Sequence, residues 1–328
     1  MAREGITRSY PQAARALNED WSTHYDGKQI QRWTQAAGQT LLDQQSAECR
    51  AYEQGVRPPG PANDPDLLVI GMDGGRVQGR DRRDPDGSRW REDKVLTISR
   101  YRPGDARWNK PPQPLVTTYL ATMHDCRQFG VRARVEAERR GIRQARQVVV
   151  LGDGAAWIDT LHEQHFARHV RIVDWYHAVE HLHEVSRAVH PDDTPARQRL
   201  VDRLETALWH GQVQTVVLAL KELAQRAGPA READPPDHPR RVLARNVGYF
   251  QRHAEHMNYP AYRNRGWPIA TGMTESGVKQ FNQRVKGTEQ FWHDHGVEPV
   301  LALRSLWLSE DDRWNHYWWY HQTPRAAA

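Results

Sequence analysis

The spacing of hydrophobic residues changes along the chain, and each spacing predicts a different element. In residues 10–48, apolar residues recur at helical spacing in YPQAARAL and again in QIQRWTQAAGQTLL, with the polar break STHYDGK between them. A short helix, a turn and a longer helix are typical of a helix-turn-helix, and a plain helical hairpin is the alternative. If this segment reads DNA, we expect Lys28 and Arg32 to face the DNA.

Strand-like runs begin after residues 56–66, whose sequence VRPPGPANDPD is rich in Pro and Gly and is therefore predicted to be a linker. Apolar and β-branched residues dominate LLVIGM, EDKVLTISRY and PLVTTYLATM, which indicates three consecutive strands. The helical segment CRQFGVRARVEAERRGI follows, and strands then alternate with helices through QVVVLG, AAWIDTLHEQHF, VRIVDW and YHAVEHLHEV. This order favours a ribonuclease-H-like α/β domain with a mixed sheet flanked by helices.

The pattern is helical again after residue 190. Patches such as ARQRLVDRLETALW and VVLALKELAQRA indicate an all-helical insertion into the α/β domain. The predicted organisation is therefore a helix-turn-helix-like DNA-binding region at 1–55, a linker at 56–66, the first part of the core at 67–190, the insertion at 191–265, the second part of the core with Glu275 at 266–322, and a disordered tail at 323–328.

Composition narrows the class of protein. Of the 328 residues 38% are hydrophobic and 27% are charged, which suits a soluble protein with a packed core, and no run of ~18 apolar residues exists to span a membrane. The first residues lack the apolar stretch of a signal peptide, so we expect a cytoplasmic location. The net charge is +5, and only six of the 46 basic residues are Lys. Arginine binds phosphate bidentately, which favours a nucleic-acid partner, although a GC-rich genome produces the same bias.

Three acidic residues stand where a metal site for phosphodiester chemistry needs them. Asp73 follows the apolar run LLVIGM and Asp153 follows VVVLG, so each comes at the end of a predicted apolar strand run, and the glycines after them leave room for a phosphate. Glu275 lies in TGMTESGVKQ, near the start of a predicted helix. Magnesium prefers carboxylate oxygens, and paired magnesium ions catalyse phosphodiester cleavage. Each acid alone is also an ordinary turn or capping residue, so the hypothesis depends on the combination.

Several motifs in a fixed order carry a resemblance to a known family. The chain resembles bacterial insertion-sequence DDE transposases of the Kra type, which are relatives of the Mutator-like transposases, over residues 67–318. The resemblance is carried, in order, by GMDGGRV, WREDKV, VVVLGDGAAWIDTLHEQHF, IVDWYHAVEHL, MTESGVKQFNQRVKG and LALRSLWLSEDDRW. Family members usually carry a cysteine-bearing zinc-binding segment before the helix-turn-helix, whereas this chain begins at that region and has only two cysteines.

The resemblance implies a transposase that cleaves DNA at the ends of an insertion sequence and transfers the cut strand. It implies that Asp73, Asp153 and Glu275 are the catalytic, metal-binding acids and that they hold two Mg²⁺ ions, with Mn²⁺ as a substitute. Asp174 and His177 match the family's D-x-x-H signature and are expected to support the site without being core metal ligands. Double-stranded DNA (terminal repeats and target), a homo-oligomer and a nucleoid-associated place in a bacterial cytoplasm are the implied partners and location.

Basic residues on two predicted helices are candidates for contact with DNA. Lys279, Arg284 and Lys286 follow Glu275 on one helix, and Trp292 beyond them is placed to stack on an unpaired base. The predicted helix that begins at CRQFGVRARV is loaded with arginine, which indicates either a phosphate track or a solvated face.

Two other functions fit parts of the sequence. A domesticated or truncated transposase would keep the fold and the basic charge as a non-catalytic DNA-binding protein. A zinc peptidase is the remote alternative, because His177, Glu180 and His181 spell H-x-x-E-H and Glu255 is a possible third ligand.

Overall fold

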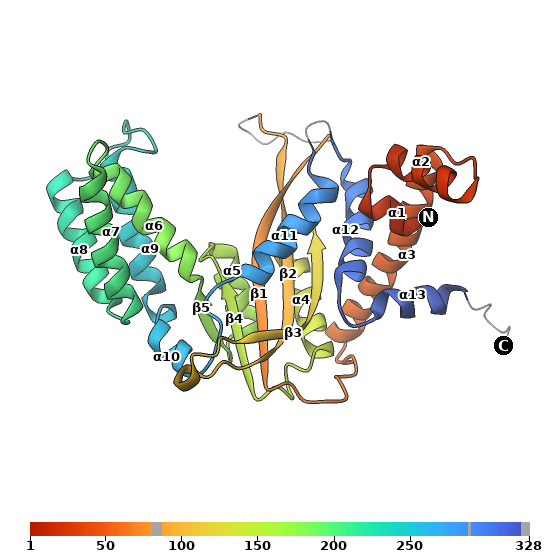
Figure 1. The fold of residues 1–328 in the computed structure, drawn as a ribbon, viewed down its shortest axis with the longest axis horizontal. Coiled ribbons are helices and arrows are strands. Elements are labelled where there is room, and N and C mark those ends of the chain that lie inside the picture. The colour runs from red at the N-terminus through yellow and green to blue at the C-terminus, as the bar shows by residue number, and fades with distance from the viewer. Residues whose placement is uncertain (81–86, 288–289, 323–328) are drawn as a thin grey trace. The chain divides into compact units, whose positions relative to one another are not determined.

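The computed structural model describes residues 1–80, 87–287 and 290–322, and its chain divides into two compact units (Figure 1). Unit 1 comprises Met1–Tyr101, Pro114–Val148 and Gly272–Ala328, and unit 2 comprises Arg102–Gln113 and Val149–Thr271. The tail predicted to be disordered, 323–328, lies outside the described residues. No helix in the described part of the chain combines the length and the apolar character needed to cross a membrane.

A five-stranded mixed sheet confirms the predicted fold class, an α/β fold of the ribonuclease-H-like kind with helices flanking the sheet. The strands run in the order β3-β2-β1-β4-β5, with β1 antiparallel to β2 and β4 parallel to β5. Three strands in succession followed by strand–helix alternation are what the sequence predicts. Their bounds are β1 Leu67–Gln78, β2 Trp90–Arg102, β3 Gln113–Thr122, β4 Gln147–Gly152 and β5 Val170–Val173.

The register of β1 and β2 decides which side chains share a face of the sheet. Asp73 lies opposite Val95 and Gly75 lies opposite Asp93. Side chains along a strand alternate between the two faces. Asp73, Val95 and Asp93 therefore point to the same face of the β1–β2 pair.

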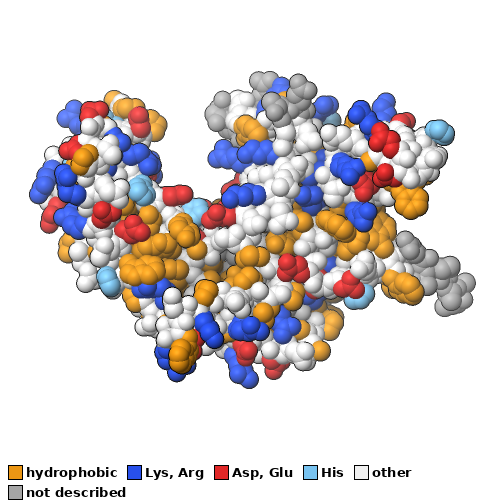
Figure 2. All heavy atoms as spheres, in the orientation of Figure 1, with side chains coloured by type: hydrophobic (Ala, Val, Ile, Leu, Met, Phe, Trp, Pro, Cys, Tyr) orange, Lys and Arg blue, Asp and Glu red, His pale blue; other side chains and the backbone are white. Residues whose placement is uncertain are grey.

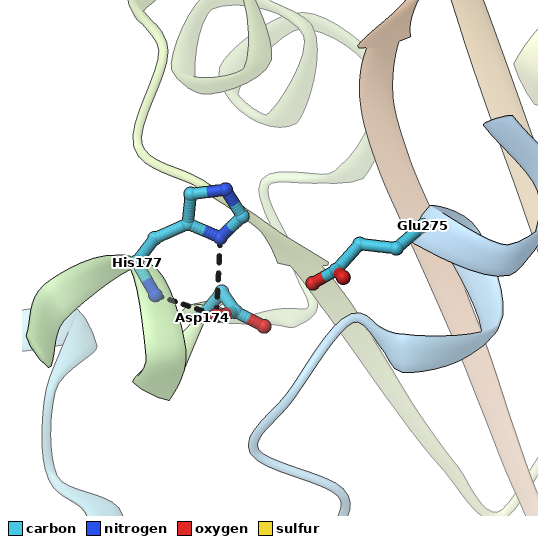
Figure 3. Close-up of side chains that lie close together, drawn as sticks. All are labelled: Asp174, His177 and Glu275. Carbon is cyan, nitrogen blue, oxygen red and sulfur yellow. Dashed lines mark hydrogen bonds and ion pairs between the residues drawn. The ribbon is translucent and has the colours of Figure 1, made fainter. Parts of the chain in front are cut away.

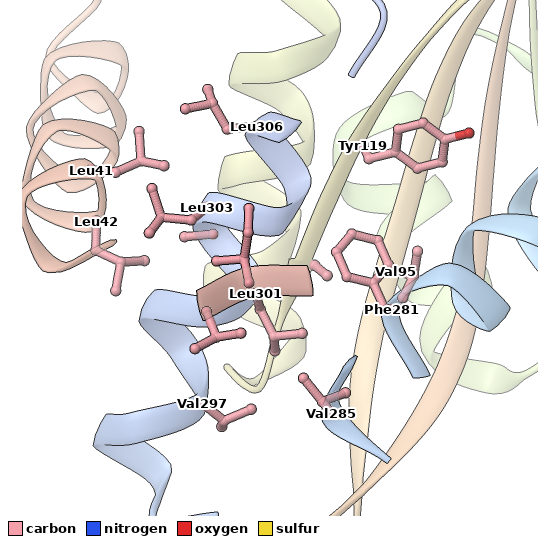
Figure 4. Close-up of a cluster of buried hydrophobic side chains, with 14 of the residues drawn as sticks. Leu41, Leu42, Val95, Tyr119, Phe281, Val285, Val297, Leu301, Leu303 and Leu306 are labelled. Atoms are coloured by element: carbon pink, nitrogen blue, oxygen red, sulfur yellow. The ribbon is translucent and has the colours of Figure 1, made fainter. Parts of the chain in front are cut away.

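Helices α1, α3, α11, α12 and α13 of unit 1 pack apolar side chains against strands β1, β2 and β3 in a hydrophobic core (Figure 4). Leu41 and Leu42 come from α3, Leu301 from α12, and Val95 from β2. The helices are α1 Ala2–Thr7, α2 Tyr10–Trp21, α3 Gly27–Glu53, α4 Cys126–Arg139, α11 Gly272–Val285, α12 Asp294–Leu308 and α13 Arg313–Gln322.

The helices expected in residues 10–48 are present as α2 and α3, preceded by the short helix α1, which the sequence pattern does not predict. Capping residues explain where α2 and α3 begin. Asp26 accepts a hydrogen bond from the backbone N–H of Gln29 (2.7 Å), and Ser9 donates from its backbone N–H to Oε1 of Gln12 (3.3 Å). The long helix α3 packs on α12, where a Cβ on Gly38 would lie 2.3 Å from the carbonyl oxygen of Pro299. The N-terminal helices therefore share the core of unit 1.

The arginine-rich helix α4 is tied to acidic side chains, which corrects the idea of a phosphate track. Glu136 is buried and contacts Arg139 (3.1 Å), Arg140 (3.0 Å) and Arg313 (2.5 Å). Arg132 is also buried and donates to Glu298 of α12 at 3.1 Å. Because these guanidinium groups neutralise internal carboxylates, they join α4 to α12 and α13 instead of forming a free basic surface.

Unit 2 carries the remaining helices, and α6 to α9 pack against one another in the region predicted to be helical (Figure 1). On the face drawn in Figure 2, Lys and Arg side chains of these helices are interspersed with Asp and Glu, so that face carries no track of one sign. The elements are a short 3-10 turn Ala106–Trp108, α5 Ala156–Leu161, a π-helical turn His162–Phe166, α6 Trp175–Val189, α7 Thr194–Trp209, α8 Val213–Ala227, α9 Pro239–His253, a 3-10 turn Ala254–His256 and α10 Tyr259–Asn264.

Candidate functional site

Asp73 lies within β1 and is half-buried in unit 1. One of its carboxylate oxygens accepts a hydrogen bond from the backbone N–H of Gly74 at 2.7 Å. This local bond orients the side chain from the backbone that carries it. The sequence pattern predicted that Asp73 ends its strand. Strand β1 instead continues beyond Asp73 to Gln78, so the acid lies inside a long strand.

Helix α11 packs on β1 beside Asp73. Gly71, two residues before Asp73, has no side chain, and a Cβ there would lie 2.0 Å from Thr274 Oγ1 and 2.6 Å from Thr97 Oγ1. These two buried hydroxyls hydrogen-bond each other at 2.8 Å. Glu275 follows Thr274 in the first turn of α11 and is half-buried. Unit 1 thus packs the helix that carries Glu275 on the strand that carries Asp73, although the two acids are far apart in the sequence.

A third acid, Asp93, lies on the same face of unit 1, and the sequence reading did not single it out. Its side chain is 0% exposed, and neither carboxylate oxygen has a hydrogen-bond partner among the described residues. Burial raises the pKa of Asp93 to about 6, and the charges of Glu92 and Asp73 add to the effect. The available signal was the alternation of WREDKVLT, which places Asp93 in step with the inward-facing Val95 and Thr97.

Asp153 belongs to unit 2 and directly follows β4, as predicted. Its Oδ1 accepts a hydrogen bond from the backbone N–H of Ala155 at 2.8 Å. The turn continues through Gly154, whose φ of +90° is strained for any residue with a side chain. A glycine is therefore required immediately after the acid.

Two residues of α9 hold the Asp153 turn in place. A Cβ on Gly154 would lie 2.9 Å from the ring of Tyr249 and 3.2 Å from Nε2 of His253. The hydroxyl of Tyr249 donates to the backbone carbonyl of Asp153 at 3.1 Å. This contact could not be predicted from the sequence, because Tyr249 and His253 lie far from β4 along the chain and carry no motif that links them to it.

A buried arginine lies below the same turn. Arg171 of β5 is 2% exposed and donates from Nη1 to the carbonyl oxygen of Gly152 at 3.3 Å. Its Nε lies 3.4 Å from Asp159 Oδ1. Burial lowers the pKa of Arg171, and the negative charges of Asp159 and Asp153 oppose that shift. A fixed cation thus accompanies Asp153 inside unit 2.

Asp174 and His177 form a local pair at the start of α6 (Figure 3). Asp174 Oδ1 accepts hydrogen bonds from the backbone N–H of His177 (2.9 Å) and from its Nδ1 (3.1 Å), while Oδ2 accepts from the hydroxyl of Thr271 (2.8 Å) and from its backbone N–H. The hydrogen bond that the His177 ring donates to Asp174 raises the pKa of His177 to about 9. Asp174 therefore caps α6, fixes the chain at Thr271 and keeps His177 protonated at neutral pH.

The zinc-peptidase alternative fails on the geometry of the H-x-x-E-H segment. His181 stacks on Tyr249 with ring centroids 3.8 Å apart, and its Nδ1 lies 2.7 Å from Asn246 Oδ1. Over residues 1–80, 87–287 and 290–322, no cluster of three metal-ligating side chains contains both His177 and His181. The two imidazoles have separate structural partners.

The residues predicted to contact DNA divide into exposed and buried groups. Lys279 of α11 and Lys286, which directly follows α11, are exposed, and Lys286 Nζ lies 5.3 Å from the centre of the Trp90 ring. Lys28 and Arg32 are also exposed on α3, as predicted, and their contact with DNA stays a prediction.

Arg284 and Trp292 are buried, which corrects their prediction as DNA contacts. Arg284 is 2% exposed and donates from Nε to the carbonyl oxygen of Gly5 at 2.8 Å. Its guanidinium lies 4.9 Å from the ring centre of Trp292, whose Nε1 donates to the carbonyl oxygen of Val285 at 2.9 Å. Both side chains join the N-terminal helices to α11. A long side chain that points inward from a helix packs in the core and therefore cannot reach a ligand.

Comparison with known proteins gives only a distant likeness. No family model and no curated protein matches the chain. Among solved structures, the chain is similar to the Drosophila P element transposase strand transfer complex, with 10% sequence identity and a TM-score of 0.36 over 93% of this chain and 91% of that chain. A likeness at this distance carries no argument about activity, so the function must be argued from the residues.

Proposed function

We propose that the protein is a DDE-type transposase, which cleaves DNA at the ends of an insertion sequence and joins the freed strand to target DNA. The observation that carries the proposal is the packing at Gly71 of helix α11 on strand β1 within unit 1, because α11 carries Glu275 and β1 carries Asp73. The motif order of the insertion-sequence family supplies the third acid, Asp153, from unit 2. On this proposal the three carboxylates act together on DNA.

The donor set suits Mg²⁺. Asp73, Glu275 and Asp153 offer hard carboxylate oxygens, and the protein keeps the buried carboxylate of Asp93 on the same face as Asp73 without a hydrogen-bond partner among the described residues. Two bound Mg²⁺ ions would activate the attacking oxygen and stabilise the leaving oxygen of the phosphodiester.

The protein's own residues then bind and orient the DNA and fix the acids. Lys279 is exposed on the helix that carries Glu275 and Lys286 is exposed directly after it, so both attract backbone phosphates towards that acid. The hydroxyl of Tyr249 holds the Asp153 carbonyl oxygen, so the Asp153 turn is fixed before DNA binds. Fixed acids matter because misplacement by ~1 Å can cost a factor of ~100 in rate.

The first test is nicking of supercoiled DNA in Mg²⁺ or Mn²⁺ by the wild type and by Asp73→Asn, Asp153→Asn and Glu275→Gln. We expect each substitution to abolish nicking while DNA affinity is retained. Glu222→Gln is the matched control, because Glu222 is an exposed acid of α8. Normal nicking by Asp153→Asn would show that Asp153 is not part of the catalytic triad. DNA binding without nicking by the wild type in either metal would favour the non-catalytic alternative.

A second test asks whether the three acids meet at one metal. Ferrous iron in place of Mg²⁺, with ascorbate and peroxide, cuts a polypeptide next to the bound ion. We expect cuts near residues 73, 153 and 275 in the same chain, and loss of all three in Asp73→Asn. Cuts near 73 and 275 without one near 153 would separate Asp153 from the metal site.

A further inference from the structure

Asp93 is an acid whose carboxylate the fold buries in the interior of unit 1. The side chain is 0% exposed on β2, and both oxygens lack a hydrogen-bond partner among the described residues. Gly75 lies directly opposite, and a Cβ there would lie 2.5 and 2.8 Å from the two carboxylate oxygens. The glycine therefore leaves just enough room for this acid.

The sheet register puts Asp93 beside Asp73. Asp73 pairs with Val95, so Asp93 is its diagonal neighbour on the adjacent strand and points to the same face. Diagonal neighbours in an antiparallel pair lie ~7–8 Å apart at the backbone and their side chains are closer. Two aspartates at this spacing can offer oxygens to one cation.

An isolated buried carboxylate is costly, since water no longer solvates its charge. The positive charge of Lys94 offsets that cost only in part, because Lys94 points to the opposite face of β2 and pairs with Glu92 at 3.2 Å. The repulsion from Asp73 makes the arrangement worse. A divalent cation between the two acids would remove both penalties at once.

We propose that Asp93 is a further ligand of the divalent cation held by Asp73, so that this end of the site is a pair of aspartates on adjacent strands. Mg²⁺ commonly takes one or two protein carboxylates and completes its shell with water and phosphate oxygens, which such a pair permits. This proposal depends on the proposed function only for the choice of a divalent cation of the Mg²⁺ class.

The test is Mn²⁺ binding, measured by the electron paramagnetic resonance of free Mn²⁺, together with the melting temperature with and without the ion. Asp93→Asn keeps the shape of the side chain and removes its charge. We expect it to raise the Kd for Mn²⁺ by about tenfold or more. In the metal-free protein it should also raise the melting temperature, because the buried charge is gone. Glu92→Gln, an adjacent acid on the opposite face, should leave the Kd unchanged.

Asp93→Asn should thus weaken metal binding and stabilise the metal-free fold, and a purely structural role for Asp93 would not produce both effects. An unchanged Kd in Asp93→Asn, with a raised Kd in Asp73→Asn, would overturn the proposal. If Asp93→Asn does not fold, Gly75→Ala decides, because the new methyl displaces the Asp93 carboxylate and should weaken Mn²⁺ binding. An unchanged Kd there would also overturn it. If Mn²⁺ binding requires Asp93 but the protein does not nick DNA, the proposed function is refuted and the proposed role of Asp93 as a ligand stands.

Discussion

The contact between Gly71 and Thr274 makes the candidate site sensitive to a single methyl group. In Gly71→Ala the new Cβ would lie 2.0 Å from Thr274 Oγ1, whereas ordinary contact begins near 3.4 Å. Thr274 is stiff because it is β-branched, and its hydroxyl is held by Thr97 at 2.8 Å. Helix α11 must therefore shift away from β1, or the buried hydroxyl pair must break.

The magnitude follows from these two routes. Overpacking a core contact costs ~1–3 kcal/mol, and losing a buried hydrogen bond costs ~0.5–1.5 kcal/mol. We expect Gly71→Ala to lower the free energy of unfolding by about 2 kcal/mol, measured by urea denaturation. A shift of α11 by ~1 Å also moves Glu275 away from Asp73, so metal-dependent nicking should fall by about a hundredfold while DNA affinity holds.

A double substitution and a matched control isolate the cause. Thr274→Ala removes the clashing oxygen, so Gly71→Ala combined with Thr274→Ala should cost less than the two single changes added together. Gly248→Ala in α9 adds a methyl into open space, and a helical alanine should leave stability equal or higher. Additive effects of Gly71→Ala and Thr274→Ala would refute the reasoning that this contact sets the position of α11.

Three further predictions follow from the contacts described above. Arg313→Met should lower the free energy of unfolding by about 3 kcal/mol at pH 7 by breaking a buried ion pair. Burial alone would raise the pKa of Glu136, but Arg313, Arg140 and Arg139 outweigh it and lower the pKa to about 2. The ion pair therefore stabilises the fold fully above the unfolded pKa near 4.5, and this stabilisation fades as the pH falls towards 2. Urea titrations of Arg313→Met should accordingly show a smaller loss of unfolding free energy at pH 3 than at pH 7. Tyr249→Phe should cost more free energy in Mn²⁺ binding at Asp153 than in unfolding, and Mn²⁺ binding equal to that of the wild type would contradict the positioning role of Tyr249. Lys279→Ala should weaken DNA binding and flatten its salt dependence in electrophoretic mobility shifts, with no change in fold.

Local pattern was enough to predict the five strands and the longer helices of this fold, although not the short helix α1. Alternating and continuous apolar runs placed β1, β2 and β3 in order, and the capping residues Ser9 and Asp26 mark the starts of α2 and α3. These signals depend on residues within one or two turns of each other, so they can be read without knowing the rest of the chain.

Side-chain direction was harder to predict than secondary structure. Arg284 in the last turn of α11 and Lys286 just beyond its end stand two positions apart, yet Arg284 is buried against Tyr10 and Trp292 while Lys286 is exposed. Which of the two faces solvent depends on the N-terminal helices packing against that side of α11, a contact between distant segments. The same reason explains why the arginines of α4 bind internal acids.

The helical region between β5 and α11 is more than an insertion that the sheet tolerates. Helix α9 supplies the ring of Tyr249 against Gly154 and a hydrogen bond to the Asp153 carbonyl oxygen. It also supplies His253, which lies 3.7 Å from Asp159 in the buried cluster around Arg171. A helix that holds the backbone of a proposed catalytic acid cannot be shortened or replaced without moving that acid. The helical region therefore forms part of the support of Asp153, and substitutions on α9 should change activity even though none of its residues is proposed to bind metal.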